Sequence, residues 1–357
     1  MQTDYSVIGL MSGTSLDGLD VALCHFTENS GSWSYEILCA CTFPYSEEWK
    51  SRLQNLENAS AFEYALTNVE LGHLFGKKVN EFMRDHAICR NDVDFISSHG
   101  HTVFHRPELG LTTQIADINA IAAETALPVV GDFRTLDVAL GGQGAPLVPV
   151  GDRLLFAEYS SCLNLGGIAN ISFTENGRRV AFDISPCNMI LNHLAEKLGK
   201  KYDEDGRIAQ SGSVNNGLLA RLDALQYYEQ DPPKSLGKEW FLQYFLPLVE
   251  ESEISVADAL ATSVEHIARQ IAGVLNGNGL ETLVVTGGGA FNRFLVERLR
   301  NCTGCRITVP DSMIINYKEA MIFAFLGILR MRGESNCLSS VTGARTSNCG
   351  GVCSGVF

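Results

Sequence analysis

Three glycine-bearing turns, each placed directly after a short apolar strand, constrain the fold of this chain more than any other feature. They lie at residues 13–18, 166–167 and 287–289. Glycine at such a turn lets backbone N–H groups approach an anion closely, because no side chain is in the way. Three turns of this kind in two halves of one chain predict a nucleotide held between two domains, with the first two turns on its phosphates and the third near its base. Three ordinary turns in a chain with 34 glycines are the alternative.

The first turn joins two predicted strands, 7–10 and a strand that begins at Leu19. It consists of Gly13, Thr14, Ser15, Leu16, Asp17, Gly18, Leu19 and Asp20. The hydroxyls would add donors for a phosphate, and Asp17 and Asp20 could hold a metal ion. No GxxxxGK[ST] motif occurs in the chain, which excludes a P-loop, and the span from Gly13 to Gly18 is one residue too long for the GxSxG nucleophile elbow. A tight hairpin turn without a ligand is the alternative.

Composition narrows the class of protein. A chain of 357 residues is long enough for two packed domains. A formal net charge of −14 argues against nucleic acid or an anionic membrane as partner. The longest apolar run, 320–329, is about half of a membrane span, and no basic and apolar leader is present, so we expect a cytoplasmic protein. Eleven scattered cysteines indicate reduced thiols, with Cys302 and Cys305 in a turn between a helix and a strand.

Strands alternate with helices along the chain, and this order predicts an α/β architecture. Apolar periodicity predicts helices over 61–74, 75–86, 189–198, 257–275 and 318–331, and strands over 35–42, 94–98, 129–134, 161–165, 168–173, 179–183 and 282–286. We expect a loose end from Ser347 onward. The sequence contains no recognisable internal repeat.

Five polar side chains have positions suited to chemistry. Asp183 ends a predicted strand, where it could act as a general base or only cap the next helix. Glu319 follows the start of a predicted helix, a position that by itself favours a simple interaction with the helix dipole. Arg134 could bind a carboxylate or phosphate, or form a salt bridge. His99 and His101 would share one face of an extended chain; without a third ligand, a sugar-binding or loop-stabilising role is favoured over metal binding.

Seven segments, in order over nearly the whole chain, closely resemble the anhydro-N-acetylmuramic acid kinase family. They are 13–20, Ser98-His-Gly-His-Thr102, Asp132-Phe-Arg134, 141–149, Asn164-Leu-Gly-Gly-Ile-Ala-Asn170, Phe182-Asp-Ile-Ser-Pro-Cys-Asn188 and Thr286-Gly-Gly-Gly-Ala-Phe-Asn292. The resemblance implies an α/β fold of the actin-like ATPase (ribonuclease H-like) type, with a nucleotide cleft between two domains, and a homodimer. The expected domains are 1–131 plus 336–357, and 132–335.

The resemblance also implies an activity, in which ATP and water open the 1,6-anhydro ring of anhydro-N-acetylmuramic acid and O6 is phosphorylated during cell-wall recycling. Asp183 would take a proton from the water that attacks the anomeric carbon, and Glu319, as the family's second acid, would hydrogen-bond the sugar. ATP would be bound by 13–20, Gly166, Gly167, Gly287, Gly288, Gly289 and Asn292. Mg²⁺ would bridge the phosphates, with Asp20 as its ligand. His99, Arg134 and Asn170 would contact the sugar, Arg134 through its lactyl carboxylate.

Three departures from the family's usual motifs bear on sugar contact. His101 replaces a glutamine, Ala116-Asp117-Ile118 replaces Gly-Asp-Gly, and Asp183-Ile184-Ser185-Pro186 replaces Asp-Thr-Gly-Pro. Ser185 adds bulk beside the proposed base. Two other functions stay open: an actin-like kinase for another sugar, and a non-catalytic, nucleotide-dependent protein that binds or senses muropeptides. The presence of Asp183 and Glu319 argues against the second.

Overall fold

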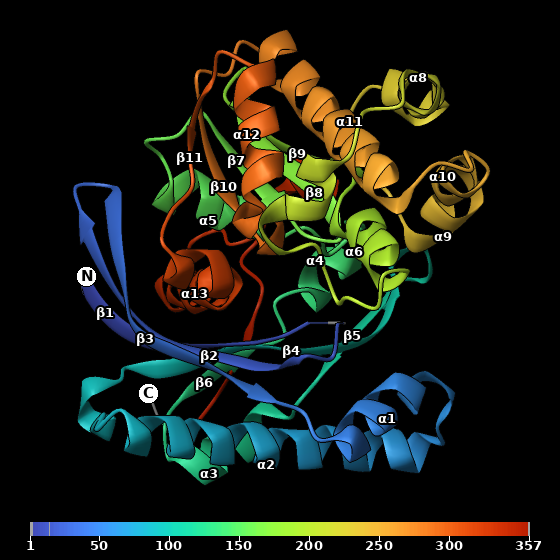
Figure 1. Ribbon diagram of the computed structural model, residues 1–357. Helices are drawn as coiled ribbons and strands as arrows, with labels where there is room; N and C mark the ends of the chain where they lie inside the picture. The colour runs from blue at the N-terminus through green and yellow to red at the C-terminus, as the bar shows by residue number, and fades with distance from the viewer. Residues whose placement is uncertain (1–2, 14, 356–357) are drawn as a thin grey trace. The chain divides into compact units, whose positions relative to one another are not determined.

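The computed structural model describes residues 3–13 and 15–355, so Thr14 of the first glycine turn lies outside the described residues. The chain divides into two compact units (Figure 1). Unit 1 comprises Met1–Leu155 and Tyr317–Phe357, and unit 2 comprises Phe156–Asn316. These units differ from the predicted domains, because residues 132–155 and 317–335 fold within unit 1.

The sheet of unit 1 combines an antiparallel meander with parallel strands. Its members are β1 (Asp4–Ser12), β2 (Gly18–Asn29), β3 (Ser32–Pro44), β4 (Phe95–Arg106), β5 (Leu111–Ile115), β6 (Val129–Gly131) and β12 (Val352–Ser354). The order is β12-β6-β4-β1-β2-β3, with β5 paired to β4. Strands β1, β2 and β3 pair antiparallel, whereas β4 is parallel to both β1 and β6.

Helices cover both faces of this sheet. Unit 1 contains α1 (Glu47–Asn55), α2 (Ala61–Asp85), α3 (Ile118–Thr125), α4 (Thr135–Ala139), α5 (Val148–Leu155), α14 (Ser339–Thr342) and most of α13 (Ser312–Arg332). Figure 1 shows α2 and α3 on one face and α13 on the other. Phe75 and Phe82 of α2 are fully buried in one core with Ile8 and Ile96 of the strands. Burial of such large apolar side chains is the main stabilising contribution.

Glycines allow α13 to lie directly on the sheet. A Cβ atom at Gly9 of β1 would overlap the carbonyl oxygen of Ala320, and a Cβ atom at Gly327 would lie 2.6 Å from Ser97 Oγ. Ser97 also donates to the carbonyl of Phe323, at 2.5 Å. At Gly9 and at Gly327 the neighbouring atoms thus lie closer to the glycine backbone than a side chain would permit.

The sheet of unit 2 repeats the topology of unit 1. Its strands are β7 (Ser161–Leu165), β8 (Ile168–Glu175), β9 (Arg178–Pro186), β10 (Thr282–Thr286) and β11 (Arg306–Thr308), in the order β11-β10-β7-β8-β9. As in β3-β2-β1-β4-β6, three antiparallel strands are followed by two parallel ones. The predicted α/β class is confirmed, and a duplicated topology is what an actin-like fold requires.

Helices of very different lengths surround the sheet of unit 2. The helices are α6 (Asn188–Glu196), α7 (Arg207–Ser211), α8 (Asn216–Asp223), α9 (Lys238–Trp240), α10 (Leu246–Glu250), α11 (Val256–Gly277) and α12 (Arg293–Cys302). Short helical turns across the chain are η1 (Leu56–Asn58), η2 (Arg90–Asp92), η3 (Pro107–Leu109), η4 (Glu204–Gly206), η5 (Gln226–Glu229), η6 (Phe241–Phe245) and η7 (Gly288–Phe291). Ser255 caps α11 by accepting from the N–H of Asp258. The buried face of α11 includes Val264 and Ile271, which join the core of this unit.

Several predicted elements have different bounds in the structure. The helices predicted over 61–74 and 75–86 form the single helix α2, since no helix-breaking residue separates them. The strand predicted to end at residue 98 continues as β4 to Arg106, and the strand predicted over 129–134 stops at Gly131. Helix α13 begins at Ser312 instead of residue 318. Glu319 therefore lies beyond the first turn, and the interpretation as a first-turn dipole partner was wrong.

The C-terminal tail is not the loose end that its composition suggested. Strand β12 pairs antiparallel with β6. Asn348 is 7% exposed and donates from Nδ2 to Asp137 Oδ1 at 2.8 Å. A tail that contributes a strand and buried hydrogen bonds is part of the folded unit.

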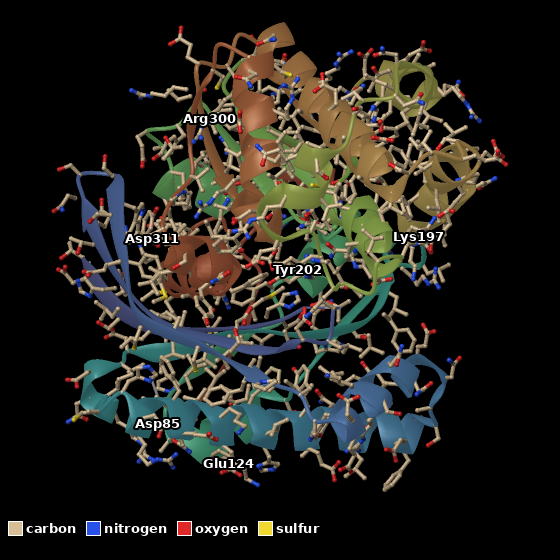
Figure 2. All side chains as sticks on the ribbon, viewed as in Figure 1. Asp85, Glu124, Lys197, Tyr202, Arg300 and Asp311 are labelled. Atoms are coloured by element: carbon tan, nitrogen blue, oxygen red, sulfur yellow. The ribbon has the colours of Figure 1, made fainter. Side chains whose placement is uncertain are left out.

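Helix α13 is the one helix, within the described residues, whose length and apolar composition would suit a membrane span; 67% of that window is buried inside the structure. This burial is what a core helix requires. Charged side chains lie on the outside of each unit, among them Asp85 and Glu124 in unit 1 and Lys197 and Arg300 in unit 2 (Figure 2).

We expect Gly9→Ala to lower the free energy of unfolding by roughly 2 kcal/mol or more, because the added methyl group would overlap the backbone of α13. Gly273→Ala is the matched control: this glycine lies on the exposed side of α11 with no atom within 4 Å of a Cβ, and the change should stabilise by roughly 0.5 to 1 kcal/mol. Urea unfolding followed by circular dichroism measures both. Equal midpoints for Gly9→Ala and wild type would contradict the close packing of α13.

Candidate functional site

The first glycine turn is held at the end of β1 by a chain of buried hydroxyl and imidazole groups. Ser12 Oγ lies 2.7 Å from Tyr45 Oη and 3.0 Å from His101 Nδ1. Gly18 closes the turn on the other side, where a Cβ atom would overlap the carbonyl of Phe43. At Gly13, by contrast, the nearest atom to a Cβ is Ser15 Oγ at 3.6 Å. Gly18 is thus required by packing, whereas Gly13 leaves open backbone that a ligand could approach.

Asp20 lies on β2 just after this turn. Thr42 Oγ1 donates to Asp20 Oδ1 at 2.6 Å. Burial raises the pKa of Asp20, and the charge of Asp17 raises it further, while the bond from Thr42 lowers it. A cation bound here would relieve the cost of burying this carboxylate. Among the described residues no group of three or more His, Cys, Asp or Glu side chains could hold a metal ion. The donor set suits Mg²⁺, which commonly takes one or two carboxylates together with water and phosphate.

Helix α13 brings a lysine and a glutamate to this unit's site. Lys318 Nζ and Asp152 Oδ1 form a buried ion pair at 2.7 Å. The next residue, Glu319, retains solvent-exposed surface, yet the surrounding protein removes enough water from its carboxyl to raise the pKa. Arg134 and Lys318 lower that pKa, and Asp20 raises it. The charges of Asp20, Arg134 and Lys318 therefore all act on the carboxyl of Glu319 within unit 1.

Arg134 is fixed by His99 and a loop carbonyl. Its Nε and Nη2 donate to His99 Nε2 at 3.0 and 2.9 Å, and its Nη1 donates to the Gly144 carbonyl at 2.7 Å. Burial and the Arg134 charge hold the pKa of His99 well below its usual range, so the ring is neutral. Its proton lies on Nδ1, which donates to the Gly100 carbonyl at 2.9 Å. These contacts use three of the five guanidinium N–H groups and leave two for an anion.

Asp137 is a fully buried carboxylate behind Arg134 that sequence reasoning missed. It accepts from the Gly144 N–H at 2.8 Å and from Thr342 Oγ1 at 2.9 Å, besides Asn348. Asp137 thus ties the Gly144 carbonyl that holds Arg134 to the C-terminal tail. A single aspartate in a glycine-rich stretch carries no sequence signal for these contacts, because its partners in the tail lie about 200 residues away.

The first two of the three glycine turns form hairpins, as predicted, and the third enters η7. At the β7–β8 hairpin, the Gly166 carbonyl accepts from the N–H of Asn188, and the Gly167 carbonyl accepts from those of Cys187 and Met189. A Cβ atom at Gly167 would have Met189 Cε as its nearest neighbour, at 3.9 Å. The hairpin therefore connects to the start of α6 while the outer side of Gly167 stays open.

The third glycine turn packs against the second. Gly287 has a φ of 80°, and a Cβ atom there would overlap Asn164 Oδ1. A Cβ at Gly289 would lie 2.7 Å from Leu165 Cβ, whereas one at Gly288 would be 3.7 Å from its nearest neighbour, Asn188 Nδ2. The two turns meet because β7 and β10 are parallel and end at one edge of the sheet. Gly167 and Gly288 leave open backbone at that edge.

Asn292, predicted to bind the nucleotide, has a structural contact. Its Oδ1 accepts from the N–H of Leu295 at 2.9 Å and caps α12. The side chain is largely buried. Capping accounts for this asparagine without a ligand.

Asp183 lies on β9 and pairs with Asn170 of β8. The N–H of Leu236 donates to Asp183 Oδ2 at 2.9 Å. Burial raises the pKa of Asp183, and the bond from Leu236 only partly opposes this. Helix α6 has Cys187 as its N-cap residue, without a side-chain bond, so Asp183 does not cap it. A half-buried carboxylate with a raised pKa is suited to accept a proton.

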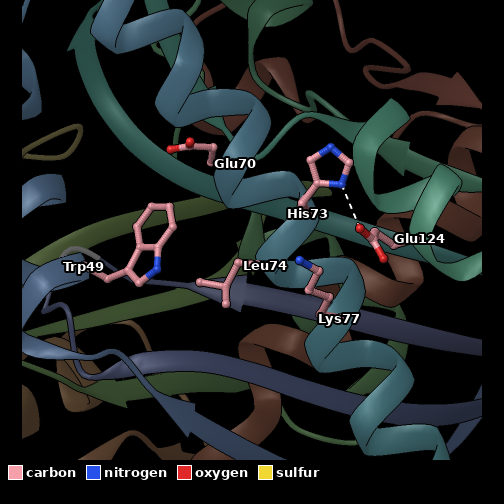
Figure 3. A pocket seen from close by; sticks show the side chains of 6 residues that line it. All are labelled: Trp49, Glu70, His73, Leu74, Lys77 and Glu124. Carbon is pink, nitrogen blue, oxygen red and sulfur yellow. Dashed lines mark hydrogen bonds and ion pairs between the residues drawn. The ribbon is translucent and has the colours of Figure 1, made fainter.

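The described residues of unit 1 border at least two cavities. One cavity, of about 260 Å³, is bordered by His99, which is a predicted sugar contact, and by Ala116, Ile118 and Asp132. The other, of about 500 Å³, is bounded by Trp49, Glu70, His73, Leu74, Lys77 and Glu124 of α1, α2 and α3 (Figure 3). There His73 Nδ1 lies 2.9 Å from Glu124 Oε1. None of the predicted site residues borders the larger cavity.

Comparison with known proteins assigns the family. The family model described as "Anhydro-N-acetylmuramic acid kinase" matches residues 5–354. The chain is 37% identical to the anhydro-N-acetylmuramic acid kinase of Mannheimia succiniciproducens, over 95% of this chain and 96% of that protein. It is 36% identical to the enzyme of the same name from Aliivibrio fischeri, over 94% and 95%. The chain belongs to the anhydro-N-acetylmuramic acid kinase family.

Solved structures that resemble this member of the anhydro-N-acetylmuramic acid kinase family are distant in sequence. One is the activator of the 2-hydroxyisocaproyl-CoA dehydratase from Clostridium difficile with bound ADPNP, at 12% identity and a TM-score of 0.45, over 92% of this chain and 97% of that one. Likeness at this level supports no conclusion about ligands.

At two of the departures from the usual motifs of anhydro-N-acetylmuramic acid kinases, Ala116 and His101, the structure shows the backbone conformation or the contacts of the replacing residue. Ala116 has a φ of 99°, which suits the glycine usual at that position and is strained for alanine. His101, in place of glutamine, is 4% exposed and keeps a hydrogen bond to Ser12. Burial lowers the pKa of His101 to about 4. A sugar contact of His101 is not needed to explain its position, because it stabilises the end of β1.

We expect His101 to make the stability of this kinase depend on pH. Between pH 6.5 and about pH 4 the unfolded chain binds a proton at His101 and the folded chain does not, so the free energy of unfolding falls as the pH is lowered. The loss is about 3 kcal/mol. His101→Gln should remove most of this slope, as measured by urea unfolding between pH 7 and pH 4. The control is His73→Gln, at a side chain that is 43% exposed. If His101→Gln kept the full slope, the neutral buried ring would be disproved.

Proposed function

We propose that this chain uses ATP and water to open the 1,6-anhydro ring of 1,6-anhydro-N-acetylmuramic acid and to phosphorylate O6, giving N-acetylmuramic acid 6-phosphate and ADP in cell-wall recycling. The observation that carries the proposal is Asp183, a carboxylate with a raised pKa held at the edge of a sheet. The glycine turns of the same unit and the membership of the family also support this proposal.

Asp183 would act as the general base. Its Oδ2 is occupied by the N–H of Leu236, which leaves Oδ1 to accept a proton. Water then attacks the anomeric carbon as its proton passes to Asp183, the bond from the anomeric carbon to O6 breaks, and O6 takes the γ-phosphoryl group. This combines the base of an inverting glycosidase with phosphoryl transfer, so the leaving oxygen needs no acid to protonate it. A raised pKa makes Asp183 a stronger base than an ordinary aspartate.

ATP and Mg²⁺ fit the residues that the structure offers. Gly13, Gly167 and Gly288 leave open backbone where a Cβ atom would take up space, and Asp20 offers a partly buried carboxylate for the metal ion. When bound, ATP supplies the phosphoryl group and Mg²⁺ offsets the charge of its phosphates. Gly18, Gly287 and Gly289 serve packing, so their part in nucleotide binding would be indirect.

Arg134, His99 and Glu319 would hold the sugar. Arg134 keeps its charge, since burial lowers its pKa only to about 10. Its two remaining N–H groups could pair with the lactyl carboxylate, and neutral His99 would fix its orientation. Glu319 would hydrogen-bond a sugar hydroxyl, and Asn170, across the strand pair from Asp183, would contact the same sugar.

The quaternary state and the compartment are also proposed. The family resemblance favours a homodimer, and a substrate released by cell-wall turnover together with the need for ATP favours the cytoplasm. The net charge of −14 disfavours nucleic acid as a partner. Two other functions compete: a kinase for another sugar, and a protein that binds muropeptides without turnover.

We expect Asp183→Asn to reduce turnover by orders of magnitude while the binding of sugar and ATP is mostly retained, because the amide cannot accept the proton of water. The measurement is ADP release with ATP, Mg²⁺ and anhydro-N-acetylmuramic acid, together with calorimetric titration of each ligand. Asp311→Asn, at an exposed aspartate of the same unit, is the matched control.

Each alternative gives a different result. A non-catalytic sensor would release no ADP with either protein, and a kinase acting on a free hydroxyl of another sugar would prefer that sugar and tolerate the loss of the base. Full activity of Asp183→Asn with anhydro-N-acetylmuramic acid would contradict the proposed role.

A further inference from the structure

Two consecutive tyrosines of η5 contact the strand end that carries Asp183. Tyr227 Oη donates to the main-chain carbonyl of Asp183 at 2.6 Å. Tyr228 Oη lies 3.4 Å from the Oγ of Ser185, which is itself fully buried. One short helical turn therefore contacts β9 at the residues before and after Ile184.

Tyr228 is in turn anchored from behind. Its Oη lies 2.8 Å from Nε2 of His266 on α11, and His266 Nδ1 lies 2.6 Å from Asp223 Oδ1 at the end of α8. Gln270 Nε2 donates to the same carboxylate oxygen at 3.1 Å. The rings of Tyr228 and His266 meet edge to face, with centroids 5.0 Å apart. The Tyr228 hydroxyl thus lies against two elements, β9 through Ser185 and α11 through His266, and α8 holds His266 in place through Asp223.

The hydrogen bonds that run from Tyr228 through His266 to Asp223 have a defined donor and acceptor at each step. Burial lowers the pKa of His266 by more than Asp223 raises it, so the ring is neutral. Burial acts to raise the pKa of Asp223, but the interactions with His266, Gln270 and Arg269 together lower it, so Asp223 is ionised. The ring proton lies on Nδ1 and points to Asp223, which leaves Nε2 to accept from Tyr228. The oxygen of Tyr228 is then free to accept from Ser185.

Ser185 stands where the family's usual motif has glycine, and the tyrosine explains how the chain accommodates it. A glycine would offer Tyr228 no partner at this position. The serine hydroxyl can bond Tyr228 or, at 3.0 Å, the carbonyl of Pro186. The extra side chain is thus directed into the unit and held there, instead of adding bulk beside the carboxyl of Asp183.

We propose that Tyr228, held by His266 and Asp223 and in contact with Ser185, is a positioning residue that sets the place of Asp183 relative to the attacking water. The inference rests on the proposed role of Asp183 as base. A general base acts only within hydrogen-bond reach of the proton that it takes, so a small shift of β9 is costly in rate. Tyr227 holds the backbone of Asp183, and Tyr228 holds the residue two positions further along.

Tyr228→Phe removes only the hydroxyl. We expect kcat for ADP release with anhydro-N-acetylmuramic acid to fall roughly tenfold to a hundredfold, with KM for sugar and for ATP changed less than about twofold. His266→Gln can still donate to Asp223 and accept from Tyr228, so it should retain more kcat than His266→Ala. Tyr202→Phe, at an exposed tyrosine of the same unit, should behave as wild type.

The decisive comparison places Tyr228→Phe in the Asp183→Asn protein. If Tyr228 acts through the base, the second change should cost nothing further in the residual rate, because residues that act as a unit are not additive. A full additional loss, or equal changes in kcat and KM together with a lowered melting temperature, would show a merely structural tyrosine and overturn the proposal. Wild-type kcat in Tyr228→Phe would do the same while leaving the function intact. Wild-type turnover in Asp183→Asn would instead remove the proposed role of Asp183 as base, and no ADP release by the wild-type protein would remove the proposed function itself.

Discussion

The contact between the backbones of Gly9 and Ala320 is the constraint on which the site of unit 1 depends. Because Gly9 has no side chain, the carbonyl of Ala320 lies where a Cβ atom would be, and α13 crosses β1 at a fixed place. The residue before Ala320 is Glu319. Three residues after Gly9, β1 ends at Ser12 and enters the first glycine turn. One contact therefore sets both the proposed sugar-binding acid and the proposed phosphate loop.

Burial of charge, balanced by few but specific partners, determines the chemistry that each unit can support. In unit 1, Arg134 remains cationic because burial lowers its pKa only to about 10, and its charge in turn moderates the raised pKa of Glu319. In unit 2, Asp183 has one backbone donor and otherwise loses water, so it is a base with a raised pKa. Buried polar groups are costly unless bonded. Arg134 bonds His99 of β4 and the loop carbonyl of Gly144, and Asp183 bonds the loop N–H of Leu236.

Local patterns account for what the sequence predicted correctly. The first two glycine turns form hairpins because alternating apolar residues flank short turn segments, which is information held within about a dozen residues. Asp183 could be placed near a strand end for the same reason. The start of α13 was missed, although Asp311 just before it offers a capping signal and accepts from the N–H of Ile314 in the structure. The duplicated strand order is invisible in sequence, since the two units share topology and not residues.

Long-range contacts explain the rest. The C-terminal tail is held by its hydrogen bonds to Asp137. Strand β9 is contacted by Tyr227 and Tyr228, whose partners lie 38 to 44 residues away along the chain. No spacing in the sequence encodes such pairs. Tertiary contacts also decide which glycines serve packing and which leave open backbone: Gly287 packs against Asn164, whereas its neighbour Gly288 stays open.

The origin of the oxygen atoms in the product tests the central claim most directly. Turnover of 1,6-anhydro-N-acetylmuramic acid with ATP and Mg²⁺ in water enriched in ¹⁸O should place one labelled atom on the anomeric hydroxyl of N-acetylmuramic acid 6-phosphate, and none in its phosphate group, as read by mass spectrometry. Label in inorganic phosphate with the sugar ring still closed would show that water attacks ATP instead of the sugar, and would contradict the account.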